Sequence, residues 1–230
     1  MQQLALFDLD NTLLPIDSDV SWAQFLVDLN VVNANWYAKR NDYFYAQYCA
    51  GTLDIYEFLD FQLAPLAQHP RAQLLAWREE FIKKVIRPNL KPVAKALVQQ
   101  HQNSGALCAI VTATNSFITG PIAREFGVEH LIATEVEIAP NGNFTGKPSG
   151  LPSFREGKIT RVEQWLAQQG VSLSDFPESF FYSDSLNDLP LLSRVTMPVA
   201  VNPDERLRRH ANEQGWQVLD LFNRTESTDD

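Results

Sequence analysis

Asp8 and Asp10 stand on alternate residues at the end of the apolar run 4–7. Side chains two residues apart in a strand point to the same side, so this spacing directs both carboxylates into one small volume. Two carboxylates held in this way can act as a nucleophile and a general acid, or can bind a hard cation. The alternative is structural, because aspartates also form turns at the ends of strands.

Further polar residues stand at the ends of other short apolar runs or begin a predicted helix. These residues are Thr112, Thr114, Lys158, Asp184 and Asp188. Ligands of open parallel sheets bind beyond the carboxyl ends of the strands, so we expect these side chains to converge with Asp8. Each also has a structural alternative, because threonine and aspartate cap helices and a single lysine is most often a surface residue.

Several acids this close would raise one another's pKa and repel unless a cation lies among them. Oxygen ligands of this kind suit Mg²⁺, which binds few protein carboxylates and keeps positions for water and phosphate oxygens. With the ion in place, one carboxylate could attack phosphorus and form an aspartyl phosphate, while the second acid protonates the leaving oxygen. Thr112 and Lys158 would then hold the phosphoryl oxygens.

Five continuous apolar runs of strand length predict a buried sheet. They cover residues 4–9, 106–113, 130–136, 179–184 and 197–202. Continuous rather than alternating apolar residues are typical of strands buried on both faces. Helix-like stretches ending on Gly105, Gly127 and Gly170 separate these runs. We therefore predict an α/β fold with a parallel sheet between layers of helices, and a short β-hairpin at residues 135–146.

Residues 16–87 contain no convincing buried strand and instead indicate several aromatic-rich amphipathic helices. We predict a discontinuous α/β core of residues 1–15 and 88–222, with 16–87 inserted as a helical cap and 223–230 as a flexible tail. The aromatic residues of the insertion are expected to form its own core, with one or two lining a pocket.

The formal net charge of −9 opposes binding to nucleic acid and to anionic membranes. No apolar run approaches the ~18 residues of a membrane span, and no basic and apolar leader is found at the start. Cys49 and Cys108 lack metal-ligand spacing and predict two reduced thiols. We therefore expect a cytoplasmic protein, monomeric or homodimeric, whose partner is a small molecule.

Four motifs in order resemble those of the haloacid dehalogenase superfamily of aspartate-nucleophile phosphatases, over residues 4 to about 202. The matches are Asp8, Asp10 and Thr12 for D-x-D-x-T, Thr112 for a Ser or Thr, Lys158 for a Lys, and Asp184 and Asp188 for D-x-x-x-D. The resemblance implies a Rossmann-like core, hydrolysis of phosphomonoesters and a requirement for Mg²⁺. It also implies that Asp8 is the nucleophile and Asp10 the general acid and base.

The remaining roles also follow from the resemblance. Mg²⁺ would be held by Asp8, the backbone carbonyl of Asp10 and Asp184, while Asp188 would bind it directly or through water. Asn187 would assist Asp188 and is a candidate substrate-binding residue. Phosphate would be contacted by Thr112, Lys158 and the backbone N–H of Ala113.

The helical insertion is similar to the cap of the branch that includes phosphoserine phosphatase, subfamily IB. Asp17 falls nine residues after Asp8, where those enzymes place a Glu that meets the substrate ammonium, although Asp17 or Asp19 could equally cap a helix. Gln62 falls where they place an Arg that binds the serine carboxylate, and a neutral amide binds carboxylate more weakly. We therefore expect a phosphorylated amine or amino alcohol, such as histidinol phosphate, with phosphoserine as the alternative.

Three other functions compete with this one. A receiver-like phosphorylation switch would lack a helical cap, and Asp10 would make its phosphoaspartate short-lived. A dehalogenase would have no use for Asp10 or Asp184, because cleavage of a carbon–halogen bond needs neither Mg²⁺ nor a leaving-group acid. An inactive binding protein is disfavoured by the complete set of motifs.

Overall fold

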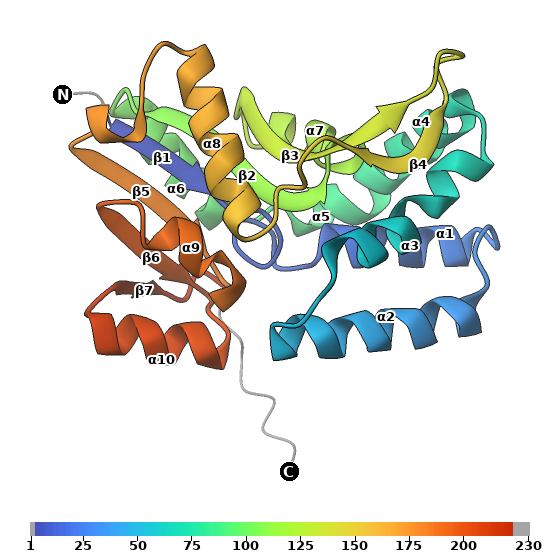
Figure 1. Ribbon diagram of the computed structural model, residues 1–230, viewed down its shortest axis with the longest axis horizontal. Coiled ribbons are helices and arrows are strands. Elements are labelled where there is room, and N and C mark those ends of the chain that lie inside the picture. Colours follow the sequence, from blue (N-terminus) through green and yellow to red (C-terminus); the bar gives the residue numbers. More distant parts are fainter. Residues whose placement is uncertain (1–2, 223–230) are drawn as a thin grey trace.

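The computed structural model describes residues 3–222 of the chain. Within them, a seven-stranded sheet has the order β4-β3-β2-β1-β5-β6-β7 (Figure 1). The strands are β1 (Gln3–Phe7), β2 (Leu107–Asn115), β3 (His130–Ile138), β4 (Phe144–Ser149), β5 (Glu178–Ser183), β6 (Met197–Val201) and β7 (Gln217–Leu219). Only the β3–β4 pair is antiparallel among these described strands. The predicted tail, 223–230, lies outside the described residues.

Helices separate the strands and cover both faces of the sheet. They are α1 (Ser18–Asp28), α2 (Ala34–Ala50), α3 (Ile55–Gln68), α4 (Arg71–Phe81), the π-helical η1 (Ile82–Ile86), α5 (Arg87–Asn89), α6 (Pro92–Asn103), α7 (Ser116–Glu125), α8 (Glu156–Gln168), η2 (Leu173–Asp175), η3 (Leu186–Asp188), α9 (Leu189–Leu192) and α10 (Glu205–Gln214). The predicted parallel α/β fold is therefore confirmed.

Successive residues of the central strand face opposite sides, which explains why its sequence is continuously apolar. Ala5 and Phe7 of β1 pack in a core cluster with residues of α1, α3, α4, α6 and α7. Leu4 and Leu6 pack in a second cluster with α8, α9 and α10. Because both faces are covered, no polar position is available along this strand until it ends.

The five predicted strands and the hairpin are present. The hairpin joins β3 to β4, and the Ala139 N–H donates to the Asn143 carbonyl at 2.8 Å beside Gly142, whose φ is +83°. The sequence interpretation missed β7, which is three residues long and pairs with β6 at the sheet edge. A strand this short and partly exposed contains no apolar run from which it could be predicted.

The helical insertion packs against the sheet layer more closely than expected. A small cluster around Tyr37, Phe44 and Phe61 belongs to the insertion itself. However, Trp22 and Phe81 lie in the large cluster shared with the sheet and α7. The run from α4 through η1 to α5 is continuously helical, so it crosses the predicted boundary at 87/88 without a break. The division into core and cap remains a prediction.

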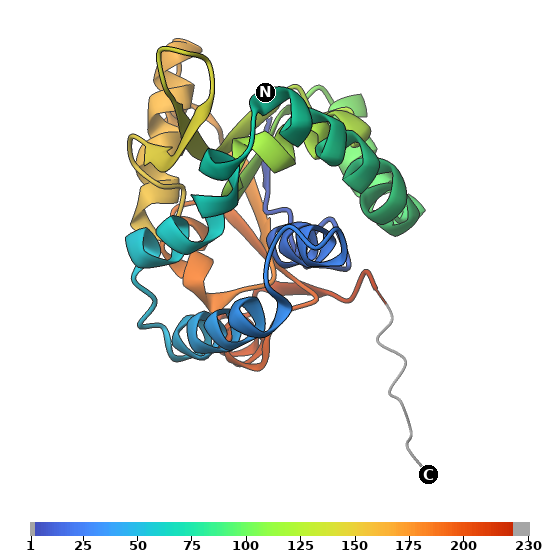
Figure 2. The same cartoon turned by 90° about the vertical axis from the view of Figure 1, so that its right-hand side faces the viewer.

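Helix α2 of the insertion lies along the same edge of the molecule as α10, and its C-terminal end points toward the start of α10 (Figure 1); Figure 2 shows the same region from the side. Arg206 of α10 donates to the Cys49 carbonyl at the end of α2. Cys49 is exposed, Cys108 is buried, and the two thiols are not joined. None of the described helices is long and apolar enough to cross a bilayer.

Candidate active site

The site is built around β1, where the strand order reverses. The neighbours of β1 are β2 on one side and β5 on the other, so its carboxyl end opens at a topological switch point. Asp8 follows directly, and its backbone N–H extends the ladder by donating to the Tyr182 carbonyl at 2.8 Å. The Asp8 side chain is thereby fixed in a buried position at this edge.

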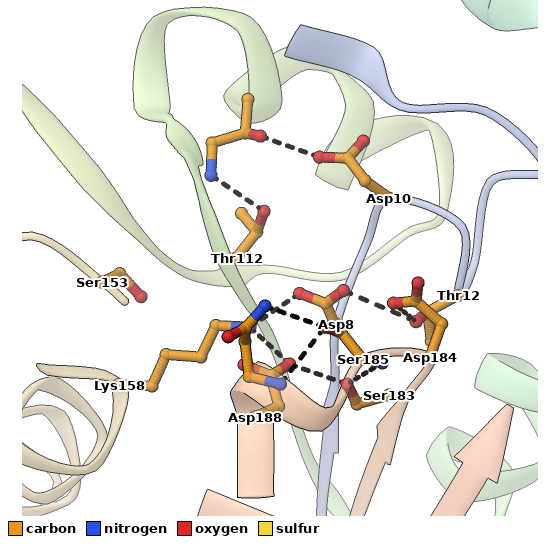
Figure 3. A network of polar contacts seen from close by, with 12 residues as sticks. Asp8, Asp10, Thr12, Thr112, Ser153, Lys158, Ser183, Asp184, Ser185 and Asp188 are labelled. Carbon is orange, nitrogen blue, oxygen red and sulfur yellow. Dashed lines mark hydrogen bonds and ion pairs between the residues drawn. The ribbon is translucent and has the colours of Figure 1, made fainter. Parts of the chain in front are cut away.

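Asp10 lies in a tight loop that turns the chain away from the sheet. The N–H groups of Leu13 and Leu14 both donate to the Leu9 carbonyl at 2.9 Å. The Asp10 carboxylate accepts from the Ser18 N–H at 2.7 Å and from the Thr114 hydroxyl at 2.8 Å. One carboxylate oxygen of Asp10 is thus held by β2 and the other by the start of α1, and the Asp10 carboxylate lies apart from the ion pairs of Asp8 (Figure 3).

Lys158 joins two of the predicted acids. Its Nζ donates to Asp8 Oδ1 at 2.9 Å and to Asp188 Oδ2 at 2.7 Å, and the lysine side chain is only 3% exposed. Asp188 also accepts from the Ser183 hydroxyl at 2.7 Å. Figure 3 shows Lys158 reaching from α8 between the ends of β1 and β5. The reading of Lys158 as a solvated surface lysine is therefore wrong.

Asp184 completes this group from the end of β5. The Thr12 hydroxyl lies 3.1 Å from Asp184 Oδ1 and 3.5 Å from Asp8 Oδ2, so it stands between the two carboxylates. We call Asp8, Asp184 and Asp188, with Lys158, the lysine-paired acid group. The threonine of D-x-D-x-T therefore has a structural role here, because Thr12 bridges the carboxylates of Asp8 and Asp184.

The electrostatics of this group are unbalanced. Burial raises the pKa of Asp8 to about 7, against the lowering effect of Lys158. Burial and the charge of Asp8 hold the pKa of Asp184 well above its usual range. Burial by itself would lower the pKa of Lys158. The neighbouring carboxylates of Asp188 and Asp8 have the larger effect, so the pKa of the ammonium is raised. Three carboxylates thus face one cation.

This donor set fits a hard divalent cation. Its oxygens are charged, buried and in excess over the single ammonium, and Mg²⁺ needs only one or two carboxylates together with neutral oxygens. Within residues 3–222, no three His, Cys, Asp or Glu side chains form a complete ligand cluster by themselves. The expected set of Asp8, Asp184, Asp188 and the Asp10 carbonyl therefore stays a prediction.

Thr112 and Ala113 lie in the last part of β2 and face the same space. The Thr112 hydroxyl accepts from the Thr114 N–H at 3.2 Å. Thr112 is not a helix cap, because Asn115 caps α7 by accepting from the Ile118 N–H at 3.3 Å. The structural alternative weighed for Thr112 is therefore wrong.

A cavity of about 180 Å³ joins these residues. Its lining contains every site residue expected from the sequence except Gln62. Gln62 is instead buried in α3 beside Leu63 and Leu66, so the structure does not bring it to the cavity. The ungapped placement of this residue by sequence position could not take account of how α3 turns against the sheet.

Asp17 caps α1 by accepting from the Asp19 and Val20 N–H groups at 2.9 Å, and it also lines the cavity. The capping role is confirmed, and its contact with a substrate ammonium stays a prediction. Asn187 lines the cavity as well, and its amide contacts the Tyr48 carbonyl and the Arg155 guanidinium. Asn187 therefore connects the site to the insertion.

Sequence reasoning missed several residues that hold the site together. Tyr48 of α2 donates to the Ser185 hydroxyl at 2.7 Å, and Ser183 supports Asp188. The two serines flank Asp184 in sequence, which was a usable signal. Nothing in the sequence indicates which face of α2 meets the core, so Tyr48 could not be found in this way.

The known proteins that this chain resembles include hydrolases and phosphatases, which agrees with the acids and the lysine gathered in this site. Residues 5–193 match the model of the haloacid dehalogenase-like hydrolase family. A histidinol-phosphatase of Neisseria meningitidis serogroup C is 46% identical over 221 residues, which are 96% of this chain and 100% of that protein.

Two solved structures are also similar. A Bordetella pertussis Tohama I protein of unknown function has a TM-score of 0.91 and 53% identity, over 96% of this chain and 100% of its own. A substrate-bound phosphoserine phosphatase has a TM-score of 0.68 at 18% identity, over 95% and 93% of the two chains, and shows the shared fold. From the family match and these relatives, the chain belongs to the haloacid dehalogenase-like hydrolases and is a phosphatase of that family.

Proposed function

We propose that this phosphatase is a Mg²⁺-dependent phosphomonoester hydrolase that forms an aspartyl phosphate on Asp8 and acts on histidinol phosphate in the cytoplasm. The observation that carries the chemistry is the lysine-paired acid group at the switch point of the sheet. The similarity to a protein named histidinol-phosphatase over the whole chain supports the substrate.

In the first step, an Asp8 carboxylate oxygen attacks phosphorus and the bond to the ester oxygen breaks. Asp10 gives its proton to the leaving alcohol. In the second step, a water oxygen attacks the phosphorus, Asp10 takes a proton from that water, and Asp8 leaves as a free carboxylate with release of inorganic phosphate. The pKa of Asp10, raised to about 7 by burial and the Asp17 charge, suits a group that both gives and accepts a proton.

Other residues bind and orient the phosphoryl group. Lys158, the Thr112 hydroxyl and the Ala113 N–H are proposed to hold its oxygens while negative charge develops there. Mg²⁺, held by Asp8, Asp184 and the Asp10 carbonyl, would neutralise the phosphoryl charge and offset the repulsion among the acids. Asp188 would keep Lys158 in place and support the ion directly or through water.

We further propose that residues 16–87 act as a cap over the core of residues 1–15 and 88–222. Support comes from the side chains of α2 and α3 that line the cavity, among them Phe44, Tyr48 and Phe58. A cover of this kind would exclude water from the phosphoryl group until the alcohol has left.

The cavity favours an amine over a carboxylate in the substrate. Among the described residues that line it, Lys158 is the only Lys, Arg or His, and it already pairs with Asp8 and Asp188. The serine carboxylate of phosphoserine would therefore have no cationic partner, while Asp17 would repel it. Histidinol phosphate has an ammonium and no carboxylate, which supports it over the alternative of phosphoserine.

The test is phosphate release from histidinol phosphate, phosphoserine and para-nitrophenyl phosphate. We expect histidinol phosphate to have the highest kcat/KM, and we expect EDTA to stop release until Mg²⁺ is added in excess. Asp8→Asn should abolish turnover, and Asp10→Asn should lower kcat by about 10²-fold or more. Mass spectrometry of acid-quenched enzyme should find the phosphoryl group on the peptide that contains Asp8.

A suitable control is Asp42→Asn, which makes the same chemical change at an exposed position on α2. It should keep full activity. The proposed substrate would be wrong if phosphoserine gave the highest kcat/KM, and the proposed chemistry would be wrong if release continued in EDTA or in Asp8→Asn.

A further inference from the structure

The cavity contains a second set of acids that the proposed phosphoryl chemistry uses only in part. Asp10, Asp17 and Asp19 surround the start of α1 and all line the cavity. We call them the α1 acid group. Asp10 has a proposed role in proton transfer, and Asp17 occupies the position expected to meet an ammonium, but nothing so far accounts for Asp19.

Asp19 is held in a defined orientation. Its Oδ1 accepts from the Asn115 amide at 3.4 Å, and the residue is 7% exposed. The Asn115 oxygen is already used to cap α7, so its NH₂ group faces Asp19. Within residues 3–222, this is the only hydrogen bond that the structure gives to the Asp19 carboxylate, so Oδ2 is left for a ligand.

No positive group of the protein neutralises this acid. Within residues 3–222, Asp17 and Asp19 take part in none of the ion pairs. Burial and the charges of Asp17 and Asp10 hold the pKa of Asp19 well above its usual range. A buried carboxylate with no cation is unfavourable, and such groups are retained where function needs them.

The adjoining wall of the cavity is aromatic. Phe44 and Phe58 line it, with their rings edge to face and their centroids 5.4 Å apart, and Tyr48 lines it beside them. Aromatic faces favour cations and planar rings through electrostatic attraction and stacking. A planar cationic ring could use both effects, whereas an aliphatic ammonium could use only the electrostatic one.

We propose that Asp19 is a specificity-determining residue that binds a second basic nitrogen of the substrate, located on a planar ring that packs against Phe44 and Phe58. This inference rests on the proposed function and deepens it. Histidinol phosphate has two basic groups, a primary ammonium and an imidazole. Asp17 would bind the ammonium and Asp19 the imidazole N–H, so the α1 acid group would distinguish this substrate from phosphates with a single amine.

The first test compares two substrates in two variants of the same helix. Asp19→Asn should lower kcat/KM for histidinol phosphate by about 10- to 100-fold, as expected for loss of a hydrogen bond to a charged group. Its kcat/KM for O-phosphoethanolamine, which has one amine and no ring, should change by less than about 3-fold. Asp28→Asn, at the exposed far end of α1, is the matched control and should change neither value.

The second test measures binding without turnover. Histamine carries the ammonium and the imidazole but no phosphate, and calorimetry of the metal-free enzyme should show it binding to wild type about 10-fold or more tightly than to Asp19→Asn. Asp19→Glu should regain part of that affinity. Equal losses for both phosphate substrates, or equal histamine affinity in wild type and Asp19→Asn, would overturn the inference.

These measurements separate the two proposals. If histidinol phosphate is hydrolysed well but Asp19→Asn keeps full selectivity, the proposed function stands and Asp19 is only structural. If histamine binds through Asp19 but histidinol phosphate is not hydrolysed, the subsite stands and the proposed substrate is wrong. Thermal unfolding of each variant excludes loss of folding as the cause.

Discussion

The lysine-paired acid group and the α1 acid group lie at the same edge of the sheet but differ in what balances their charge. Asp8 and Asp188 share the ammonium of Lys158 at 2.9 and 2.7 Å. Among the described residues, Asp17 and Asp19 accept only from backbone and amide donors. The first group therefore contains a cation of the protein, while the second would need one from a ligand.

Removal of the internal cation should give the largest effect. Lys158→Met leaves three buried carboxylates without a counter-ion, so we expect the free energy of unfolding to fall by about 3–5 kcal/mol. Turnover should fall by at least about 10²-fold because phosphoryl charge is no longer balanced. Urea denaturation and phosphate release measure the two effects.

Lys147→Met provides the control for that prediction. Lys147 pairs with Asp60 at 2.7 Å, but both side chains are more than half exposed. We expect the free energy of unfolding to change by less than about 1 kcal/mol. If both lysine variants lost the same stability, the distinction between a buried ion pair and an exposed surface pair would not hold.

The next prediction compares two acid-to-amide substitutions that should change the free energy of unfolding in opposite directions. Asp188→Asn should lower the free energy of unfolding, because it weakens a buried pair with Lys158. Asp19→Asn should raise it by about 1 kcal/mol near pH 8, because it removes a buried charge with no partner. Asp28→Asn, exposed on the same helix as Asp19, should change stability little.

The stability gained in Asp19→Asn should depend on pH, because it comes from removing an ionisable group. The folded protein holds the pKa of Asp19 well above its usual range, so at any pH above the unfolded pKa this group ionises more readily in the unfolded chain, which opposes folding. The gain in Asp19→Asn should therefore be largest at alkaline pH and should disappear as the pH falls toward the unfolded pKa of about 3.9. A gain that grew on acidification would contradict the assignment.

The smallest effect is expected for the hydrogen bond between Tyr48 of the insertion and Ser185, the residue after Asp184. Tyr48→Phe removes the hydroxyl that donates to Ser185 without changing any charge. We expect kcat/KM to fall about 3- to 10-fold, in line with one neutral hydrogen bond. Tyr43→Phe changes an exposed ring of α2 and should leave steady-state kinetics as in wild type.

Much of the core site could be predicted because it depends on strand ends. Asp8, Thr112 and Asp184 each follow a continuous apolar run, and a parallel sheet brings the carboxyl ends of its strands to one edge whatever lies between them in sequence. Lys158 could be assigned only through its place among the ordered motifs, since a lone lysine has no local signal for burial.

The cap side of the cavity could not be predicted in the same way. Gln62 was assigned by counting residues, yet the packing of α3 turns it away from the cavity. The orientation of Asp19 depends on Asn115, which is 96 residues away. Contacts of this kind depend on how helices rotate against one another, and amphipathic patterns define a face only broadly.

Arg155 connects the end of α2 in the insertion to η3 beside the lysine-paired acid group. Its guanidinium donates to the Gly51 carbonyl at 2.6 Å and to Asn187 at 3.1 Å, and its own backbone has a φ of +49°. Gly157 follows in a turn so tight that an added Cβ would lie 2.2 Å from the Pro152 oxygen, and Lys158 is next.

A rigid connection therefore runs from the end of α2 to the residue beside the attacking oxygen. If residues 16–87 act as the proposed cap, the position of its α2 end and the position of Lys158 would be set together, because the same arginine contacts Gly51 and begins the turn that leads to this lysine.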